Sequence, residues 1–413
     1  MEATRIRLAE GVHLTYLPAR KFKTSLLSAQ FVTPLRRETA GANALLAAVL
    51  RRGTVSCPDM GALSAKMDNL YDASIDYTVR KKGENQCVGF VASFIDDRYA
   101  PGGERLLEPA AALLGELICD PVTYHGRFVP EYFESEKTNL LEAIRSLIND
   151  KRDWADSRLL RALCDGEAYA VPRLGDEETV DKLQALKVYT QYRDLISTAP
   201  LEIIYSGSAD LERVKQALAA AFATLPREEV RVISTAAPHV CRESVQHVED
   251  VLDVTQGKLG MGFSCGSDDM PALLMGNTLF GGSSNSKLFL NVREKLSLCY
   301  YASSLYHRQK GLITVSSGIE FQNYQRAYDE IMAQLEAVQK GELEDWELEG
   351  ARSTLLNNYA TVGDSQGKLE NFYLGQAATG QHETPADLAR AIQDMTAERI
   401  CRAMTACREL ETD

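Results

Sequence analysis

The chain has 413 residues, and its 45 Lys and Arg against 58 Asp and Glu give a formal net charge of −13. This acidic balance argues against partners such as nucleic acid or anionic membranes, because both attract clustered Lys and Arg. The length is well beyond one common domain size. It predicts two or more domains, each able to bury a core without disulfide or metal staples.

Location is suggested by three features of the sequence. It contains no run of 18 apolar residues that would cross a membrane. Residues 1–5 lack the basic-then-apolar order of a secretion signal. The nine cysteines are odd in number, are scattered from Cys57 to Cys407 and form no C-x-x-C pair. We therefore expect a cytoplasmic protein whose cysteines are thiols of a reducing compartment.

In the first half of the chain, strand-like alternation gives way repeatedly to helical spacing of apolar residues. We expect strands at residues 12–17, 25–32, 75–79 and 86–95, and helices at residues 41–53, 105–119 and 131–150. Strands joined by a hairpin and interrupted by helices predict an α+β domain with an antiparallel-rich sheet.

The second half opens near residue 200, and after a polar connector at residues 227–243 it repeats the order of the first half. Its expected elements are strands at 201–206 and 257–264, helices at 211–225, 270–280 and 325–339, a hairpin around Gly311 and a long helix from about residue 344. The turn at residues 79–83 resembles the turn at 306–311. The repeat predicts two similar α+β domains, residues 1–185 and 200–413, each a sheet packed with helices.

Most familiar catalytic patterns are missing. The six histidines never form H-E-x-x-H or H-x-x-E-H, the spacings of helical zinc sites; they are His13, His125, His239, His247, His307 and His382. The sequence has no G-x-S-x-G elbow and no phosphate-binding G-x-x-x-x-G-K-[ST]. Gly260 and Gly262 lie in strand-like sequence without the third glycine of a dinucleotide site.

The most informative stretch is residues 279–300, where the turn Gly281-Gly282 precedes the S-x-L-F segment 286–289, and Arg293 is followed seven residues later by Tyr300. It resembles the C-terminal-domain signature of the pitrilysin/insulinase family of zinc peptidases, which includes the mitochondrial processing peptidases. The resemblance implies a glycine-rich turn at Gly281 and Gly282, and peptide contacts by Arg293 and Tyr300.

Each of these residues also has a purely structural interpretation. Arg293 is then part of a solvated helix face, and Tyr300 packs half-buried in a strand. Gly281 and Gly282 are then a backbone turn rather than a loop that holds a ligand. Residues 169–180 resemble the family's P-x-x-G-x-x-E-x-[IV] segment. The resemblance therefore extends over nearly the whole chain and implies a processing-peptidase-like duplicated domain.

In active members of the family, zinc is held by H-x-x-E-H on the first helix and by a Glu on a later helix. Alignment on Gly53-Thr54 places the H, E and H positions at Ala44, Ala47 and Ala48. The third-ligand position becomes Ala143, although a shift of one residue would bring in Glu142. One carboxylate cannot hold catalytic zinc, which takes about three protein ligands.

The resemblance thus implies a degenerate bacterial member that binds no metal or other cofactor and is not an enzyme, since it lacks activated water and a base. The same alanines are equally suited to an apolar core helix.

The family's working unit is a closed chamber of four such domains, and this chain supplies two. We therefore expect a non-catalytic subunit that forms part of a peptide-binding chamber with an active zinc-bearing insulinase-family peptidase, as a heterodimer acting on peptide or unfolded polypeptide. The alternative is a homodimeric peptide-binding or scaffold protein without an enzyme partner. The peptide, the partner and any role in maturation of translation elongation factor P stay open.

Overall fold

The computed structural model describes residues 3–233 and 247–409. The chain divides into two compact units: unit 1 is Met1–Arg145, Val171–Thr235 and Gly363–Gln381, and unit 2 is Ser146–Ala170, Ala236–Val362 and His382–Asp413. Each is an α+β unit with an antiparallel-rich sheet, as the sequence predicted. Most of the predicted connector, residues 227–243, lies outside the described residues.

Unit 1 is built on a six-stranded sheet of order β1-β2-β8-β3-β5-β4. The strands are β1 (Thr4–Ala9), β2 (Val12–Pro18), β3 (Thr24–Pro34), β4 (Ser74–Lys82), β5 (Asn85–Ile95) and β8 (Leu201–Gly207). Every neighbouring pair is antiparallel except β2 and β8. Successive side chains of β3 point to opposite faces of the sheet. Leu27, Ala29 and Phe31 enter the apolar core, whereas Ser28 and Gln30 face the other way.

Helices cover both faces of this sheet. They are α1 (Arg37–Leu50), α2 (Met60–Asp68), α3 (Leu107–Cys119), α4 (Pro130–Ser146), α6 (Glu177–Asp181), α7 (Ala185–Thr198), α8 (Leu211–Ala221) and α12 (Gln366–Thr379). Apolar residues of α1, α3 and α7 pack on the apolar face and form one core with it. A two-stranded ribbon, β6 (Thr123–Tyr124) and β7 (Arg127–Phe128), precedes α4.

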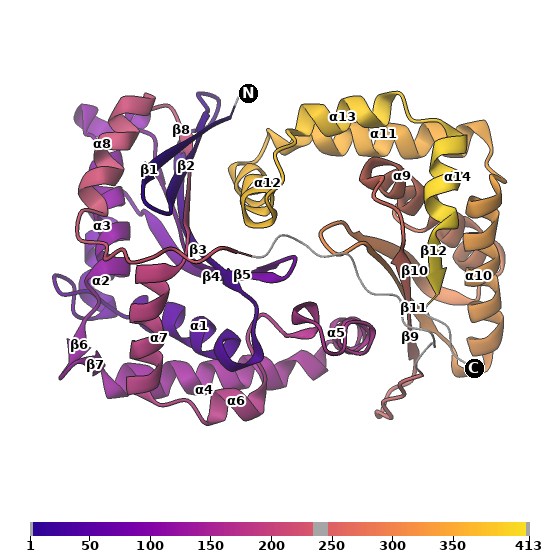
Figure 1. Cartoon of the computed structure of the whole chain (residues 1–413), viewed down its shortest axis with the longest axis horizontal. Coiled ribbons are helices and arrows are strands. Elements are labelled where there is room, and N and C mark those ends of the chain that lie inside the picture. Colours follow the sequence, from indigo (N-terminus) through magenta and orange to yellow (C-terminus); the bar gives the residue numbers. More distant parts are fainter. Residues whose placement is uncertain (1–2, 234–246, 410–413) are drawn as a thin grey trace. The chain divides into compact units, whose positions relative to one another are not determined.

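The polar face of the same sheet is covered by α12, a helix from the second half of the chain (Figure 1). Gln366 Nε2 donates to the backbone oxygen of Ser206 at 2.8 Å. Glu370 accepts from Ser28 Oγ at 2.7 Å. Because these polar groups form hydrogen bonds with one another, the helix can bury the polar face of the sheet without leaving these donors and acceptors unpaired.

Unit 2 has a four-stranded antiparallel sheet of order β10-β11-β9-β12. Its strands are β9 (Gly257–Cys265), β10 (Cys299–His307), β11 (Leu312–Ile319) and β12 (Cys407–Glu409). Its helices are α5 (Lys151–Leu163), α9 (Met270–Phe280), the π-helix η5 (Leu288–Lys295), α10 (Tyr324–Lys340), α11 (Asp345–Val362), α13 (Pro385–Gln393) and α14 (Ala397–Thr405). Of the helices described in both units, none is long and apolar enough to cross a membrane.

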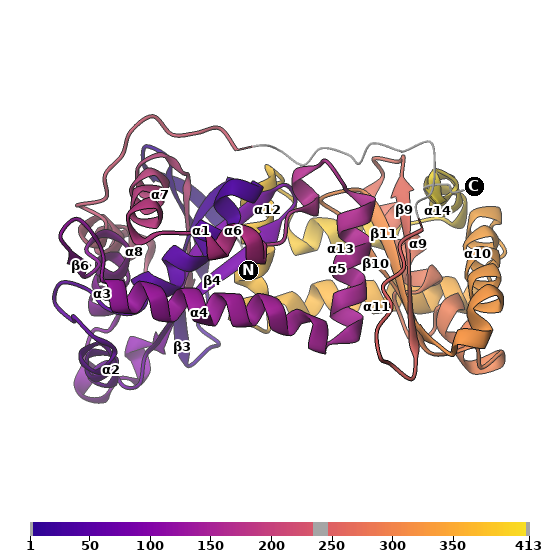
Figure 2. The same ribbon diagram turned by 90° about the horizontal axis from the view of Figure 1, so that it is seen from below.

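One of these helices, α5, comes from the first half of the chain and lies against β9 and β11 (Figure 2). A Cβ added at Gly262 would lie 2.8 Å from Cδ2 of Leu163, and one added at Gly260 would lie 3.3 Å from Cδ2 of Leu159. The G-x-G pair thus makes room for a helix to approach a strand closely. Each unit therefore receives one helix from the opposite half of the chain.

The predicted repeat is visible in the topology. The order β4-β5-β3-β8 in unit 1 corresponds to β10-β11-β9-β12 in unit 2, and α1 follows β3 as α9 follows β9. The two hairpins that were aligned by sequence also correspond, since Gly83 and Gly311 both adopt left-handed φ values, 58° and 67°.

The predicted domain boundaries differ from the structure. Strand β8 and helix α8 lie in unit 1, although residues 200–413 were expected to form the second domain. The reason is that β8 pairs with β2 and β3 in the middle of the first sheet, so it completes the first repeat instead of opening the second.

Candidate functional site

The positions predicted to correspond to the family's zinc motif lie inside helix α1. Ala44, Ala47 and Ala48 are all buried, and Ala44 and Ala47 belong to the apolar core of unit 1. A methyl group has no lone pair to offer a metal. The alanine side chains instead fill the space between the helix and its apolar neighbours without burying an unpaired imidazole or carboxylate.

A polar chain that sequence reasoning missed runs beside these alanines. Asn43 Nδ2 donates to Gln86 Oε1 at 2.9 Å, and Gln191 Nε2 donates to Asn43 Oδ1 at 2.9 Å. Gln86 Nε2 in turn donates to the backbone oxygen of Ala40 at 3.0 Å. These amides are hydrogen-bonded to one another and to the backbone, so they serve packing rather than metal binding.

The third-ligand position is on helix α4, where both Ala143 and its neighbour Glu142 are exposed. Glu136, the first Glu of the family pattern, forms an ion pair with Arg52 at 2.8 Å. Across residues 3–233 and 247–409, no three His, Cys, Asp or Glu side chains gather closely enough to hold a metal ion. The donors of α1 and α4 therefore do not fit the zinc ion that the family resemblance suggests.

The glycine turn lies between α9 and the outer edge of β10. A Cβ added at Gly281 would lie 2.7 Å from the backbone nitrogen of Ser304, which donates to the Gly281 oxygen at 2.9 Å. One added at Gly282 would lie 2.9 Å from Nδ2 of Asn277. Neither glycine has a positive φ. These positions are therefore occupied by glycine because helix and strand approach closely, not because the backbone is left-handed.

The S-x-L-F segment that follows the glycines enters the core. Ser286 and Leu288 are fully buried, and Lys287 forms a buried ion pair with Glu347 of α11 at 3.0 Å. Glu347 also accepts from the backbone nitrogen of Glu344 at 2.9 Å. This part of the signature therefore stabilises the fold, because the ion pair joins the start of η5 to α11.

Arg293 lies in the last turn of η5 and is half-exposed. Its guanidinium stacks 4.6 Å from the ring centre of Phe289, and its Nε lies 3.5 Å from a carboxylate oxygen of Glu294. Stacking holds the guanidinium plane without using all of its N–H donors. A π-helix is rare and is often found at functional sites.

Tyr300 occupies a β-bulge at the start of the edge strand β10. Cys299 pairs with Ile319 and Tyr301 pairs with Gly318, so Tyr300 is the extra residue. In a regular strand it would share the inward face of Ala302 and Ser304, both buried, but the bulge turns it outward and leaves it 61% exposed. The tyrosine ring therefore gains little from burial.

Arg293 and the bulge lie near one another in unit 2. Burial raises the pKa of the Cys299 thiol, while the positive charge of Arg293 acts in the opposite direction. The backbone nitrogen of Ser297, three residues before Tyr300, donates to the Arg293 oxygen at 3.1 Å, so the end of η5 lies next to the start of β10. The structure thus brings Arg293 and the Tyr300 bulge together, whereas the alanines of α1 and α4 belong to unit 1.

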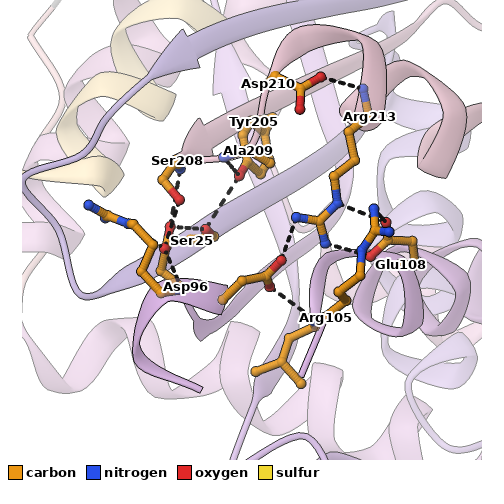
Figure 3. A network of polar contacts seen from close by, with 12 residues as sticks. Ser25, Asp96, Arg105, Glu108, Tyr205, Ser208, Ala209, Asp210 and Arg213 are labelled. Atoms are coloured by element: carbon orange, nitrogen blue, oxygen red, sulfur yellow. Dashed lines mark hydrogen bonds and ion pairs between the residues drawn. The ribbon is translucent and has the colours of Figure 1, made fainter. Parts of the chain in front are cut away.

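A polar cluster around Asp96 in unit 1 was also not foreseen. Asp96 is buried and accepts from Ser208 Oγ at 2.7 Å, Ser25 Oγ at 3.1 Å and Arg98 Nε at 2.7 Å (Figure 3). Burial would raise the pKa of Asp96, but the hydrogen bonds from Arg98 and Ser208 outweigh it and lower the pKa. Because its partners stabilise the charged form, Asp96 joins the loops after β5 and β8 and is poorly suited to accept a proton.

Comparison with known proteins supports the family resemblance. A family model described as "Peptidase M16 inactive domain" matches residues 182–355. The chain is 33% identical over 400 residues to the probable inactive metalloprotease YmfF of Bacillus subtilis (strain 168), covering 95% of this chain and 93% of that protein. It is also 22% identical over 325 residues to the uncharacterized zinc protease YmxG of the same organism, covering 76% of each.

Solved structures share the fold. A conserved protein from Enterococcus faecalis V583 has a TM-score of 0.86 and 27% identity, with 99% of this chain and 97% of the other covered. A structure described as the peptidase M16 inactive domain from Pseudomonas fluorescens has a TM-score of 0.80 and 19% identity, covering 100% and 97%. The chain belongs to the peptidase M16 family, the pitrilysin/insulinase family, as a non-catalytic homologue.

Proposed function

We propose that this protein is the non-catalytic subunit of a heterodimeric peptidase and that it supplies a peptide-binding surface around Arg293 and Tyr300. The observation that carries the proposal is the bulge in β10. It places a large aromatic side chain in solvent, where the fold gains little from it, beside an arginine on a rare type of helix.

The chemistry of the two side chains suits an extended peptide. The guanidinium of Arg293 offers several N–H donors in a planar fork, which can bind a peptide carbonyl. The phenol of Tyr300 can donate to a second carbonyl while its ring contacts a side chain. Neither group takes part in proton transfer in this proposal, so the surface would hold and orient peptide or unfolded polypeptide without cleaving it.

The partner in this proposal is a second insulinase-family subunit that carries an intact zinc site. The zinc protease YmxG, which resembles this chain over 76% of its length, is an example of the kind of protein that could fill this role. The acidic net charge makes nucleic acid and anionic membranes unsuitable partners. We place the complex in the cytoplasm, which the scattered cysteines favour.

The test is peptide cleavage by the complex reconstituted with its zinc-bearing partner, at substrate concentrations well below KM. The double variant Arg293→Ala/Tyr300→Phe should lower kcat/KM about ten-fold or more, because each lost hydrogen bond costs about 0.5–1.5 kcal/mol and a charged donor more. The matched control is Lys295→Ala/Tyr324→Phe, which removes an exposed cation of the same helix and the hydroxyl of another exposed tyrosine.

Assembly must be measured on the same samples. If the double variant assembles normally and cleaves at the wild-type rate, Arg293 and Tyr300 are structural and the proposal is wrong. If the purified chain forms a stable homodimer and no zinc-bearing subunit co-purifies from its host, the homodimeric peptide-binding or scaffold alternative replaces the heterodimer.

A further inference from the structure

Two cysteines face each other across strands β9 and β12 of unit 2. Cys265 and Cys407 are direct partners in the antiparallel pairing. Their Sγ atoms lie 3.0 Å apart, and both side chains are buried, at 6% and 1% exposure. Neither residue belongs to the proposed peptide surface, so the pair calls for its own explanation.

The backbone around the pair has the geometry that a disulfide requires. The backbone nitrogen of Gly266 donates to the oxygen of Ala406 at 3.0 Å, so the next pair along the ladder, Cys265 and Cys407, is of the non-hydrogen-bonded kind. In such pairs the Cα atoms lie about 4.5 Å apart, within the range of about 4.4–6.8 Å seen across disulfides. Only side-chain rotation separates the two thiols from bonding distance.

We propose that Cys265 and Cys407 are a reversible modification site, a dithiol that a low-molecular-weight disulfide such as oxidised glutathione converts to a cross-strand disulfide. The thiolate of Cys407 attacks the small disulfide, forms a mixed disulfide and releases one small thiol. The thiolate of Cys265 then attacks the Cys407 sulfur and releases the second small thiol. The protein loses two electrons and two protons, and the small disulfide becomes two thiols.

The position of β12 determines how the reagent reaches the pair. Among the described residues, β12 (three residues) pairs with one strand, β9. It is further held by Gln339, whose Nε2 donates to the Cys407 oxygen at 2.8 Å. A short edge strand of this kind can open locally while the rest of the sheet stays folded. Opening exposes the Cys407 thiol, and closing returns it to Cys265. Oxidation therefore fastens β12 to β9.

The experiment uses the full-length wild-type chain, incubated with either oxidised glutathione or dithiothreitol, quenched in acid, alkylated after denaturation and mapped by mass spectrometry. We expect a linked peptide pair containing Cys265 and Cys407 in the oxidised sample, absent after dithiothreitol. Cys401→Ser, which removes a thiol of neighbouring helix α14, should leave the link unchanged, whereas Cys407→Ser should abolish it.

A second measurement does not depend on how well the variants fold. Oxidised wild-type protein should unfold at a higher temperature than the reduced protein, because the bond restricts the unfolded chain. The proposal is overturned if Cys265 and Cys407 remain fully alkylatable after oxidation. It is also overturned if the products are only mixed disulfides with glutathione or links between two chains.

Discussion

The ion pair between Arg80 of β4 and Glu370 of α12 tests whether the exchanged helix is an integral part of unit 1. The guanidinium nitrogens donate to the two carboxylate oxygens at 2.6 and 2.7 Å, and Ser28 Oγ donates to the same carboxylate at 2.7 Å. The Glu370 side chain is only 3% exposed, against 23% for Arg80. We predict that Glu370→Leu strongly lowers the free energy of unfolding.

The magnitude follows from what is left behind. Removing one partner of a buried pair typically costs about 3–5 kcal/mol, because the remaining charge is desolvated and unpaired. Since Arg80 keeps a quarter of its surface in water, we expect about 3 kcal/mol, the lower end of that range. Ser28 adds to this cost, because its buried hydroxyl loses the acceptor for its own hydrogen, although its oxygen still accepts from Gln30 Nε2 at 3.2 Å.

The measurement is guanidinium denaturation followed by far-UV circular dichroism, together with hydrogen exchange of α12 and its facing strands. Exchange should accelerate there in Glu370→Leu, but not in the control Lys368→Ala, which changes an exposed residue of the same helix. The double variant Arg80→Leu/Glu370→Leu should recover stability, giving a coupling energy above about 1.5 kcal/mol. A loss below about 1 kcal/mol in the single variant, or strictly additive effects, would refute the reasoning.

Two further predictions concern unit 1. The Glu116 carboxylate is partly desolvated, yet hydrogen bonds from Lys66 and Thr54 lower its pKa to about 2. Because the folded pKa is depressed, its contribution is complete above about pH 4.3 and is lost as the pH falls towards 2. Glu116→Gln should therefore cost about 1–2 kcal/mol at pH 7 and almost nothing at pH 2 in denaturation experiments, and an equal cost at both pH values would contradict this. Ala47→Glu should cost about 3–5 kcal/mol by burying an unpaired carboxylate, whereas Ala65→Glu at an exposed position should change stability little.

Elements whose determinants are local could be predicted from the sequence. The expected helix at residues 270–280 agrees with α9, and the expected strands at 75–79 and 86–95 lie within β4 and β5. Side-chain periodicity within one segment decides these elements. The alanines at the predicted zinc-motif positions are equally local, because they can be read from the sequence of the helix alone.

Features that depend on distant partners could not be predicted. The sequence of β8 is typical of a strand but does not reveal that β2 and β3 lie on either side of it. The domain boundary was therefore predicted before β8 instead of after it. The exchange of α5 and α12 is hidden for the same reason, because a helix's own sequence does not tell which sheet it packs against. In α12 the buried residues even include Gln366 and Glu370, so the apolar stripe of a typical packed helix is missing. Asp96 was missed because its donors Ser25 and Ser208 lie 71 and 112 residues away from it in the sequence.

The structure separates residues of the family signature that the fold needs from those it does not. Gly281 permits a close approach, and Lys287 is paired in the core, so folding alone can maintain both. Tyr300 differs. A regular strand would bury the ring and keep the ladder intact, whereas the bulge leaves one residue unpaired and exposes the aromatic side chain. A feature that brings the fold so little stability is best explained by a contact made outside the chain, and this reasoning supports the proposed peptide-binding role for Tyr300.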